Sequence, residues 1–255
     1  MIEDIIRPLV SERFLSDERY REGHLRVINA LPSRRVLGLH TPKMKQVAKT
    51  LSKEAGIEYI ARFEQAAPDA LAYEETVIWG FLINLQKCSL EQRLTMLERY
   101  VPVLDNWAVC DAFCANAKWM QRADKGVLWS FLLRRFASTR EFEVRFAVVA
   151  SMCYFIDEKW LQQLFEQIDK IDFSIIKSQY RSVKGRPERP QMGVVQGASP
   201  YYVRMGVAWL LATALAKFPD ATRAYVHSSS LPDDVIKLYV RKARESFRTR
   251  CVSAL

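Results

Sequence analysis

Residues 201–218 read YYVRMGVAWLLATALAKF, and residues 141–155 read EFEVRFAVVASMCYF. When either stretch is wound as an α-helix, apolar side chains cover more than half of its circumference. A helix of this kind needs neighbours on two sides, as in a solenoid of stacked helix pairs. The two stretches therefore predict a right-handed stack of antiparallel helix pairs that contains no β-sheet.

The same helical periodicity returns along nearly the whole chain. The other expected helices are 43–53, 73–86, 90–99, 101–115, 125–137, 160–170 and 232–247. Prolines fall between or at the starts of these segments, namely Pro68, Pro102, Pro200, Pro219 and Pro232. We therefore predict an all-α fold, a HEAT-like helical-repeat solenoid (an α-α superhelix), with a globular helical bundle as the alternative. Because no fixed repeat is visible, a degenerate array fits better than a regular one.

One segment interrupts the helical pattern. Residues 176–199 (IKSQYRSVKGRPERPQMGVVQGAS) hold five basic side chains against one acid, with three glycines and two prolines. This composition is typical of a loop. We predict one domain over residues 1–255 that carries this basic loop as an insertion. The loop is either a surface insertion with no role or an arm that follows a phosphate backbone.

The chain is basic, with 38 Lys and Arg against 29 Asp and Glu, a net charge of +9 and a pI near 9.4. A domain with this balance often meets a polyanion, although plain solubility is the alternative. No apolar run approaches the roughly 20 residues that span a bilayer, and MIEDIIRPLV at the start does not resemble a signal peptide. We expect a cytoplasmic monomer without a membrane partner. The five cysteines are an odd, scattered set, which favours buried thiols over disulfides.

Several common site motifs are absent from the sequence. It contains no G-x-x-x-x-G-K-[ST], G-x-G-x-x-G, H-E-x-x-H or C-x-x-C, and His24, His40 and His227 lack metal-ligand spacing. We therefore expect neither a cofactor nor a metal.

The stretch DNWAVCDAFC at 105–114 is the best candidate for chemistry. On a helix, Trp107 and Asp111 are four residues apart and project side by side. An aromatic face beside a carboxylate suits a cationic base or an electron-poor sugar. A Trp at this spacing is also common in helix cores, and an Asp often caps a helix or pairs with an arginine.

Four segments resemble the AlkD family of HEAT-like DNA alkylation-repair glycosylases. They are LGLHTPKMKQ (37–46), DNWAVCD (105–111), EVRF (143–146) and YYVRMGVAW (201–209), and the resemblance runs from about residue 20 to 246. Proteins of that family are curved stacks of helix pairs that grip duplex DNA in a basic concave face. They excise cationic bases such as 3-methyladenine and 7-methylguanine, without drawing the lesion into a pocket.

The resemblance implies a role for each matched residue. It places the catalytic carboxylate at Asp111, the neighbouring aromatic at Trp107, the second aromatic at Trp209 and the phosphate-binding arginine at Arg145. From the charge distribution we add Arg204, together with the C-terminal helix, to the expected DNA-binding groove. The partner implied is alkylated duplex DNA. An alkylated purine that already carries positive charge leaves without a general acid. The protein then has to stabilise an oxocarbenium-like sugar, and one carboxylate between aromatic faces can do this.

The match to the family is incomplete at the amino-terminal end. Better-known members carry a longer helical region there, with an aromatic that helps to hold the substrate, and Tyr20 is the candidate here. The loop at 176–199 is also longer than the usual connection. Two alternatives to a glycosylase follow: a non-catalytic HEAT-like protein that binds branched or damaged DNA, and a helical-repeat scaffold for acidic proteins.

Overall fold

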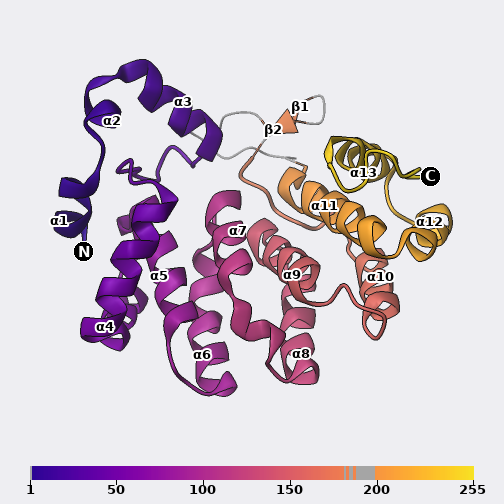
Figure 1. The fold of residues 1–255 in the computed structure, drawn as a ribbon, viewed down its shortest axis with the longest axis horizontal. Coiled ribbons are helices and arrows are strands. Elements are labelled where there is room, and N and C mark those ends of the chain that lie inside the picture. The colour runs from indigo at the N-terminus through magenta and orange to yellow at the C-terminus, as the bar shows by residue number, and fades with distance from the viewer. Residues whose placement is uncertain (1, 181, 184–185, 188–198) are drawn as a thin grey trace. The chain divides into compact units, whose positions relative to one another are not determined.

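The computed structural model describes residues 2–180, 182–183, 186–187 and 199–255 (Figure 1). The fold is all-α, as predicted, and in the described residues most helices pack against the next helix in the chain or the next but one. Contacts divide it into two compact units, with the boundary between Asp124 and Lys125. The assignment of the whole chain to one domain stays a prediction.

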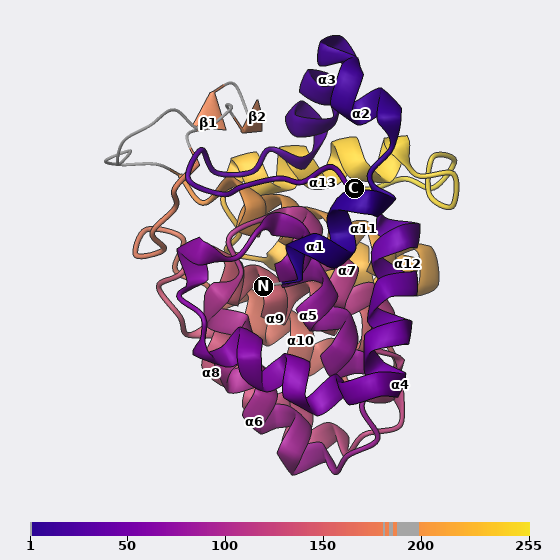
Figure 2. The ribbon, with the colours of Figure 1, turned by 90° about the vertical axis from the view of Figure 1, so that its left-hand side faces the viewer.

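The first unit is built around α5, an apolar helix over Tyr73–Leu85. It packs against α4 on one side, as Figure 2 also shows, and against α7 on another. The other helices of this unit are α1 (Glu3–Ile6), α2 (Glu12–Ser16), α3 (Glu18–Ile28), α4 (Thr41–Gln65), α6 (Leu90–Tyr100) and α7 (Trp107–Asn116). Short 3-10 turns cover Arg7–Leu9, Pro68–Ala70, Val101–Val103 and Lys118–Gln121.

The second unit is built around two helices, α9 (Glu141–Tyr154) and α11 (Tyr201–Lys217). α9 packs between α8 and α11, while α11 also contacts α12 and α13. Every residue of α9 from Glu141 to Met152 is buried. The expectation that these two apolar helices need neighbours on both sides is confirmed. The remaining helices are α8 (Lys125–Phe136), α10 (Leu161–Asp169), α12 (Pro219–Ser228) and α13 (Asp233–Glu245).

The structure differs from the predicted elements at several positions. A two-residue antiparallel pair, β1 (Ser182–Val183) with β2 (Arg186–Pro187), stands where no sheet was expected. The single helix expected over 101–115 is a 3-10 turn followed by α7, because Asn106 caps a new helix. The helix expected over 43–53 is longer and forms α4. The helices α1, α2, α3 and α12 were not predicted. Most of the basic loop, residues 181, 184–185 and 188–198, lies outside the described residues.

The five cysteines are free thiols, in agreement with the expectation of no disulfides. Only Cys110 and Cys114 are buried, whereas Cys153 and Cys251 are exposed. The expectation of buried thiols is therefore wrong for that exposed pair. Cys153 belongs to the last turn of α9, beyond the run of buried residues, and Cys251 follows the last helix.

Aromatic rings fill the core of the first unit beside Gly80. The Trp79 ring meets Tyr100 edge-on at 5.1 Å between centroids, and Tyr100 lies 5.2 Å from Phe113. A Cβ added to Gly80 would come within 2.3 Å of the Tyr100 hydroxyl oxygen and 3.2 Å of Phe113 Cδ2. The Tyr100 hydroxyl donates to the Thr76 carbonyl at 3.3 Å, and the Tyr100 side chain is fully buried. Gly80 therefore permits the close approach of α5 to these rings.

We expect Gly80→Ala to destabilise the protein by about 1–3 kcal/mol, because the added methyl overpacks a core that cannot shift freely. The control is Gly23→Ala, in the interior of α3, where an added Cβ meets nothing within 4 Å. That change should stabilise by up to about 1 kcal/mol through helix propensity. Denaturant unfolding of both variants measures the difference. Equal free energies of unfolding would contradict this account of the core.

Candidate functional site

The start of α7 is fixed by two polar side chains that precede it. Asn106 accepts a hydrogen bond from the Ala108 backbone N–H at 2.8 Å and donates from Nδ2 to the Ile28 carbonyl at 2.8 Å. Asp105 Oδ2 accepts from Nε and Nη2 of Arg34 at 2.8 and 2.7 Å. A helix N-terminus leaves backbone donors that such caps satisfy. Asp105 and Asn106 therefore set where α7 begins.

The Arg34–Asp105 pair is largely removed from solvent. The Arg34 side chain is 6% exposed and the Asp105 side chain 16%. Burial raises the pKa of Asp105, and the attraction and hydrogen bonds of Arg34 act against that rise. Arg34 also donates from Nη1 to the carbonyls of Pro68 and Leu71, at 2.5 and 2.8 Å. The arginine thus joins the start of α7 to the segment that leads into α5.

Trp107 and Asp111 lie on the same half-exposed face of α7. The opposite face buries Val109, Cys110 and Phe113 in the unit. Since the two residues are one helical turn apart, the ring and the carboxylate are neighbours on the surface. The role of this pair as a site stays a prediction. A carboxylate there can stabilise positive charge on a group that stands over the ring.

A second polar anchor holds the segment LGLH that precedes α4. The buried carboxylate of Glu74 accepts from the backbone N–H groups of Leu37, Gly38 and Leu39 at 2.9, 2.7 and 3.2 Å. Burial raises the pKa of Glu74, and these backbone donors oppose the rise. Gly38 has φ +95°, and an added Cβ would overlap the Phe14 ring at 2.2 Å. The glycine in this motif is therefore required by backbone geometry.

The start of α11 is held from α9 by Glu141 and Arg145. Glu141 Oε1 accepts from the Tyr202 backbone N–H at 2.7 Å, and its other oxygen accepts from the Ser178 hydroxyl. Arg145 Nη1 donates to the Tyr202 carbonyl at 2.6 Å, and its guanidinium lies 5.7 Å from the centre of the Tyr202 ring. Side chains of α9 thus hold both the backbone N–H and the carbonyl of Tyr202.

These contacts of Arg145 could not be predicted from the sequence. Its side chain is buried, with the residue 3% exposed, and Nη1 is used by a carbonyl of the same unit. Its role as a phosphate ligand stays a prediction. What the geometry adds is a positioning role, because the helix that Arg145 holds is the one that carries Trp209.

Burial also acts on Glu141. It raises the pKa of this carboxyl to about 7, against the lowering effect of the Ser178 and Tyr202 hydrogen bonds and of the Arg145 charge. Glu141 was not predicted as a site residue. The sequence signal available was an acid at the start of a largely apolar segment, four residues before an arginine.

Arg204, the other predicted DNA contact, is half-buried. Its guanidinium forms an ion pair with Asp234 in the first turn of α13 and lies 5.2 Å from the centre of the Phe173 ring. Its side chain is 20% exposed. The contact with DNA stays a prediction, and the structure shows that Arg204 also joins α11 to α13.

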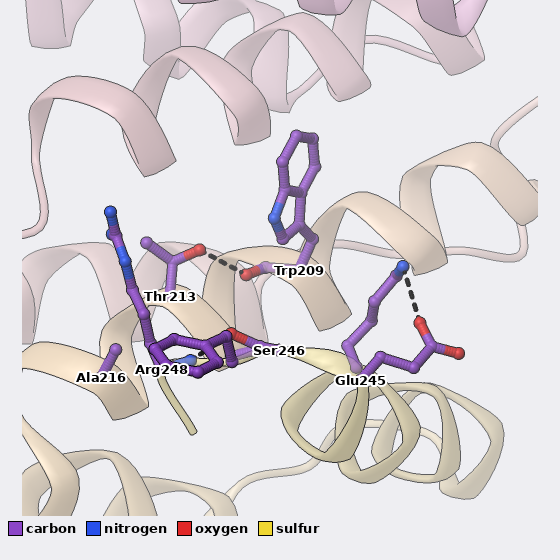
Figure 3. Close-up of a pocket in the computed structure, with 9 residues that line it drawn as sticks. Trp209, Thr213, Ala216, Glu245, Ser246 and Arg248 are labelled. Carbon is purple, nitrogen blue, oxygen red and sulfur yellow. Dashed lines mark hydrogen bonds and ion pairs between the residues drawn. The ribbon is translucent and has the colours of Figure 1, made fainter. Parts of the chain in front are cut away.

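Trp209 projects from α11 and is 39% exposed. Its ring lines a pocket of about 440 Å³ together with residues of α11, α13 and the turn that follows α13, as Figure 3 shows. Tyr20, the amino-terminal candidate aromatic, is half-buried on α3, and its hydroxyl lies 2.9 Å from His40 Nε2. Tyr20 is thus tied to the residue that precedes α4.

The predicted site residues fall into two sets. Trp107 and Asp111 share one face of α7 in the first unit, and Arg145, Arg204 and Trp209 belong to α9 and α11 in the second. The convergence of the two sets stays a prediction. Across the residues that the structure describes, no three His, Cys, Asp or Glu side chains gather as ligands for a metal ion. In the same part of the chain, no helix is both long and apolar enough to cross a bilayer.

A comparison with protein families matches residues 15–171 to the model described as DNA alkylation repair enzyme. The matched range contains Trp107, Asp111 and Arg145, and it ends before α11. No curated protein and no solved structure matches the chain.

We expect the stability of the protein to fall as pH rises from about 4.5 to about 7, because native Glu141 holds its proton more tightly than the unfolded chain does. This contribution is complete below pH 4.5 and lost above pH 7. The difference between about 7 and 4.5 corresponds to at most about 3 kcal/mol. Glu141→Gln should remove this slope, since its amide can accept from Tyr202 and donate to Ser178.

Thermal unfolding of both proteins from pH 5 to pH 8 tests this expectation. Glu141→Gln should match the native protein at the acid end and exceed it at the alkaline end. Glu158→Gln, an exposed change in the same unit, serves as the control. A native protein and a Glu141→Gln variant with parallel profiles would show that Glu141 does not titrate in this range.

Proposed function

Because the chain belongs to the DNA alkylation repair enzyme family, we propose that it is a monofunctional DNA glycosylase that hydrolyses the N-glycosidic bond of cationic alkylated purines in duplex DNA. The observation that supports this proposal most directly is the Trp107–Asp111 pair on the half-exposed face of α7. The substrates proposed are 3-methyladenine and 7-methylguanine, whose ring nitrogens carry the positive charge.

The proposed reaction requires two things of the protein, a stabilising charge and the correct positioning of the reacting groups. A cationic purine leaves as a neutral base, so its departure needs no general acid. The sugar develops positive charge as the bond to the base breaks, and a fixed carboxylate stabilises that charge. We assign this role, and the placing of the attacking water, to Asp111. Water supplies a hydroxyl group to C1′ of the sugar, and the proton that it releases passes to solvent.

The aromatic residues supply binding faces for the lesion. We assign Trp107 to the base or sugar beside Asp111, by attraction between a cation and a ring. Trp209 provides the second face, and its exposure on α11 leaves the ring accessible. Arg145 and Arg204 are proposed to hold the DNA backbone, with Arg145 acting at least through the helix that it positions. The net charge of +9 and the family support the proposed DNA binding.

We expect Asp111→Asn to slow the release of 7-methylguanine by at least about 100-fold, the scale that follows the loss of one electrostatic stabiliser. The amide keeps the shape of the side chain and removes its charge, so DNA affinity should be kept or slightly improved. Base release from methylated duplex under single-turnover conditions is the measurement. The control is Asp69→Asn, an exposed change in the same unit that should act like the native protein.

Release by Asp111→Asn at the native rate would mean that this carboxylate is not catalytic. No release by the native protein, with DNA binding intact, would favour the non-catalytic DNA-binding alternative.

We also expect DNA affinity to fall at least about 10-fold between about 50 mM and about 200 mM salt, because each phosphate that the protein neutralises releases counterions. Fluorescence anisotropy with an undamaged duplex gives the slope of log affinity against log salt. Arg204→Gln should make that slope smaller by about 0.9 if this arginine contacts one phosphate. Binding that does not respond to salt would favour the scaffold alternative.

A further inference from the structure

The protein has 13 Phe and 6 Trp residues, all of which lie in the described part of the chain. Only two of these residues are exposed. They are Phe247, at 81%, and Trp209, at 39%. Although 38 positions apart in the sequence, both line the same pocket of about 440 Å³. We call it the aromatic-basic pocket. Its other lining residues are Ala212, Thr213, Ala216, Lys242, Glu245, Ser246 and Arg248.

The turn after α13 holds Phe247 outward by an ordered set of hydrogen bonds. The Arg250 backbone N–H donates to the Ser246 carbonyl at 2.8 Å, and the buried Thr249 hydroxyl donates to the Ala243 carbonyl at 2.7 Å. The Tyr239 hydroxyl ties the residues beyond the turn by donating to the Ala254 carbonyl at 2.9 Å. A Phe ring left in water forfeits the gain of burial. A turn that is anchored on both sides and still exposes its ring points to a ligand for that ring.

The charge around the pocket is positive. Its one acidic lining residue, Glu245, is already contacted by Lys242 at 3.0 Å and by Arg241 at 3.7 Å. Arg248 adds an exposed guanidinium, and that of Arg250 lies 4.7 Å from the centre of the Phe247 ring. In Figure 3 the Trp209 ring and the Arg248 side chain extend in the same direction, with Thr213 between them. The pocket therefore offers aromatic faces and a cation to one ligand.

We propose that the aromatic-basic pocket binds one unstacked nucleotide of bound DNA, with its base against Trp209 and Phe247 and its phosphate at Arg248. Stacking on aromatic side chains next to a basic backbone contact is how unpaired nucleotides are commonly held. The volume lies within the usual range of about 300–1,000 Å³ for small-ligand sites. An acidic peptide would use the charge and leave both rings without a partner. The proposal rests on the proposed function in that DNA is the ligand and that Trp209 is one of the residues that contact it.

The test uses two duplexes that differ by one nucleotide. One is fully paired, and the other carries 2-aminopurine as a single-nucleotide bulge, whose fluorescence falls when the base stacks on a ring. We expect the native protein to quench this fluorescence and to bind the bulged duplex more tightly. Phe247→Ala should lose most of the quenching and weaken binding of the bulged duplex by about 5- to 100-fold, the range for one stacked base. Its affinity for the paired duplex should change by less than about 2-fold, since stacking is what the change removes.

Two further variants separate stacking from charge and from folding. Phe247→Tyr keeps a ring and should keep the quenching. Arg248→Gln should weaken binding of the bulged duplex and make its salt slope smaller by about 0.9. Lys170→Gln removes one charge at the end of α10, away from the pocket lining, and serves as its control. Thermal unfolding should be the same for the native protein and Phe247→Ala, because the ring is exposed.

Unchanged quenching in Phe247→Ala would overturn the proposal. A second result would also overturn it: Phe247→Ala weakens the binding of polyglutamate but not that of the bulged duplex. The pocket would then bind acidic polypeptides. The proposed glycosylase activity is judged separately. Asp111→Asn should keep the quenching, so loss of base release with quenching intact bears on Asp111 alone, and loss of quenching with base release intact bears on the pocket alone.

Discussion

A helix that begins inside a protein leaves backbone N–H groups without partners, and the positions of the candidate site residues depend on how this requirement is met. In the first unit, Asn106 caps α7, which carries Trp107 and Asp111. In the second, Glu141 takes up the N–H of Tyr202 at the start of α11, which carries Trp209. A polar side chain therefore satisfies a backbone donor at the start of each helix, from the residue before α7 in one case and from α9 in the other.

The sequence predicted the fold class because the strongest signals were purely apolar. The stretches 141–155 and 201–218 could be stable only with neighbours on several sides, and the structure supplies them. Element boundaries were predicted less well where polar contacts decide them. Asn106 caps α7 by a local bond to the Ala108 N–H, but nothing in the periodicity of 101–115 indicates that its amide also donates to the Ile28 carbonyl, 78 residues away. Long-range partners of this kind cannot be found from local spacing.

The candidate site likewise contains residues that local spacing predicts and residues whose contacts are long-range. The pair Trp107 and Asp111 follows from helical spacing and can be predicted from the sequence. The environment of Arg145 cannot, because its partner is the Tyr202 carbonyl, 57 residues further along the chain. An arginine inside an apolar helix indicated a special role without saying which groups it would meet. Phe247 carried no signal at all, since a single ring in the polar stretch RESFRTR has no periodic neighbour and its exposure depends on the turn around it.

Stabilising a developing cation and holding nucleotides place opposite demands on the proposed site residues. A group that stabilises a developing cation must be fixed before the reaction, because any reorganisation of its dipole or charge adds to the barrier. The catalytic role proposed for Asp111 is compatible with this demand, because the start of its helix is held by Asn106 and, through Asp105, by Arg34. A surface that holds nucleotides of varied sequence must instead accept many bases, which ring faces do because every base can stack. Trp209 and Phe247 have that character, whereas the α7 pair adds a charge. The proposed function therefore assigns charge stabilisation to one fixed carboxylate and nucleotide binding to adaptable ring faces.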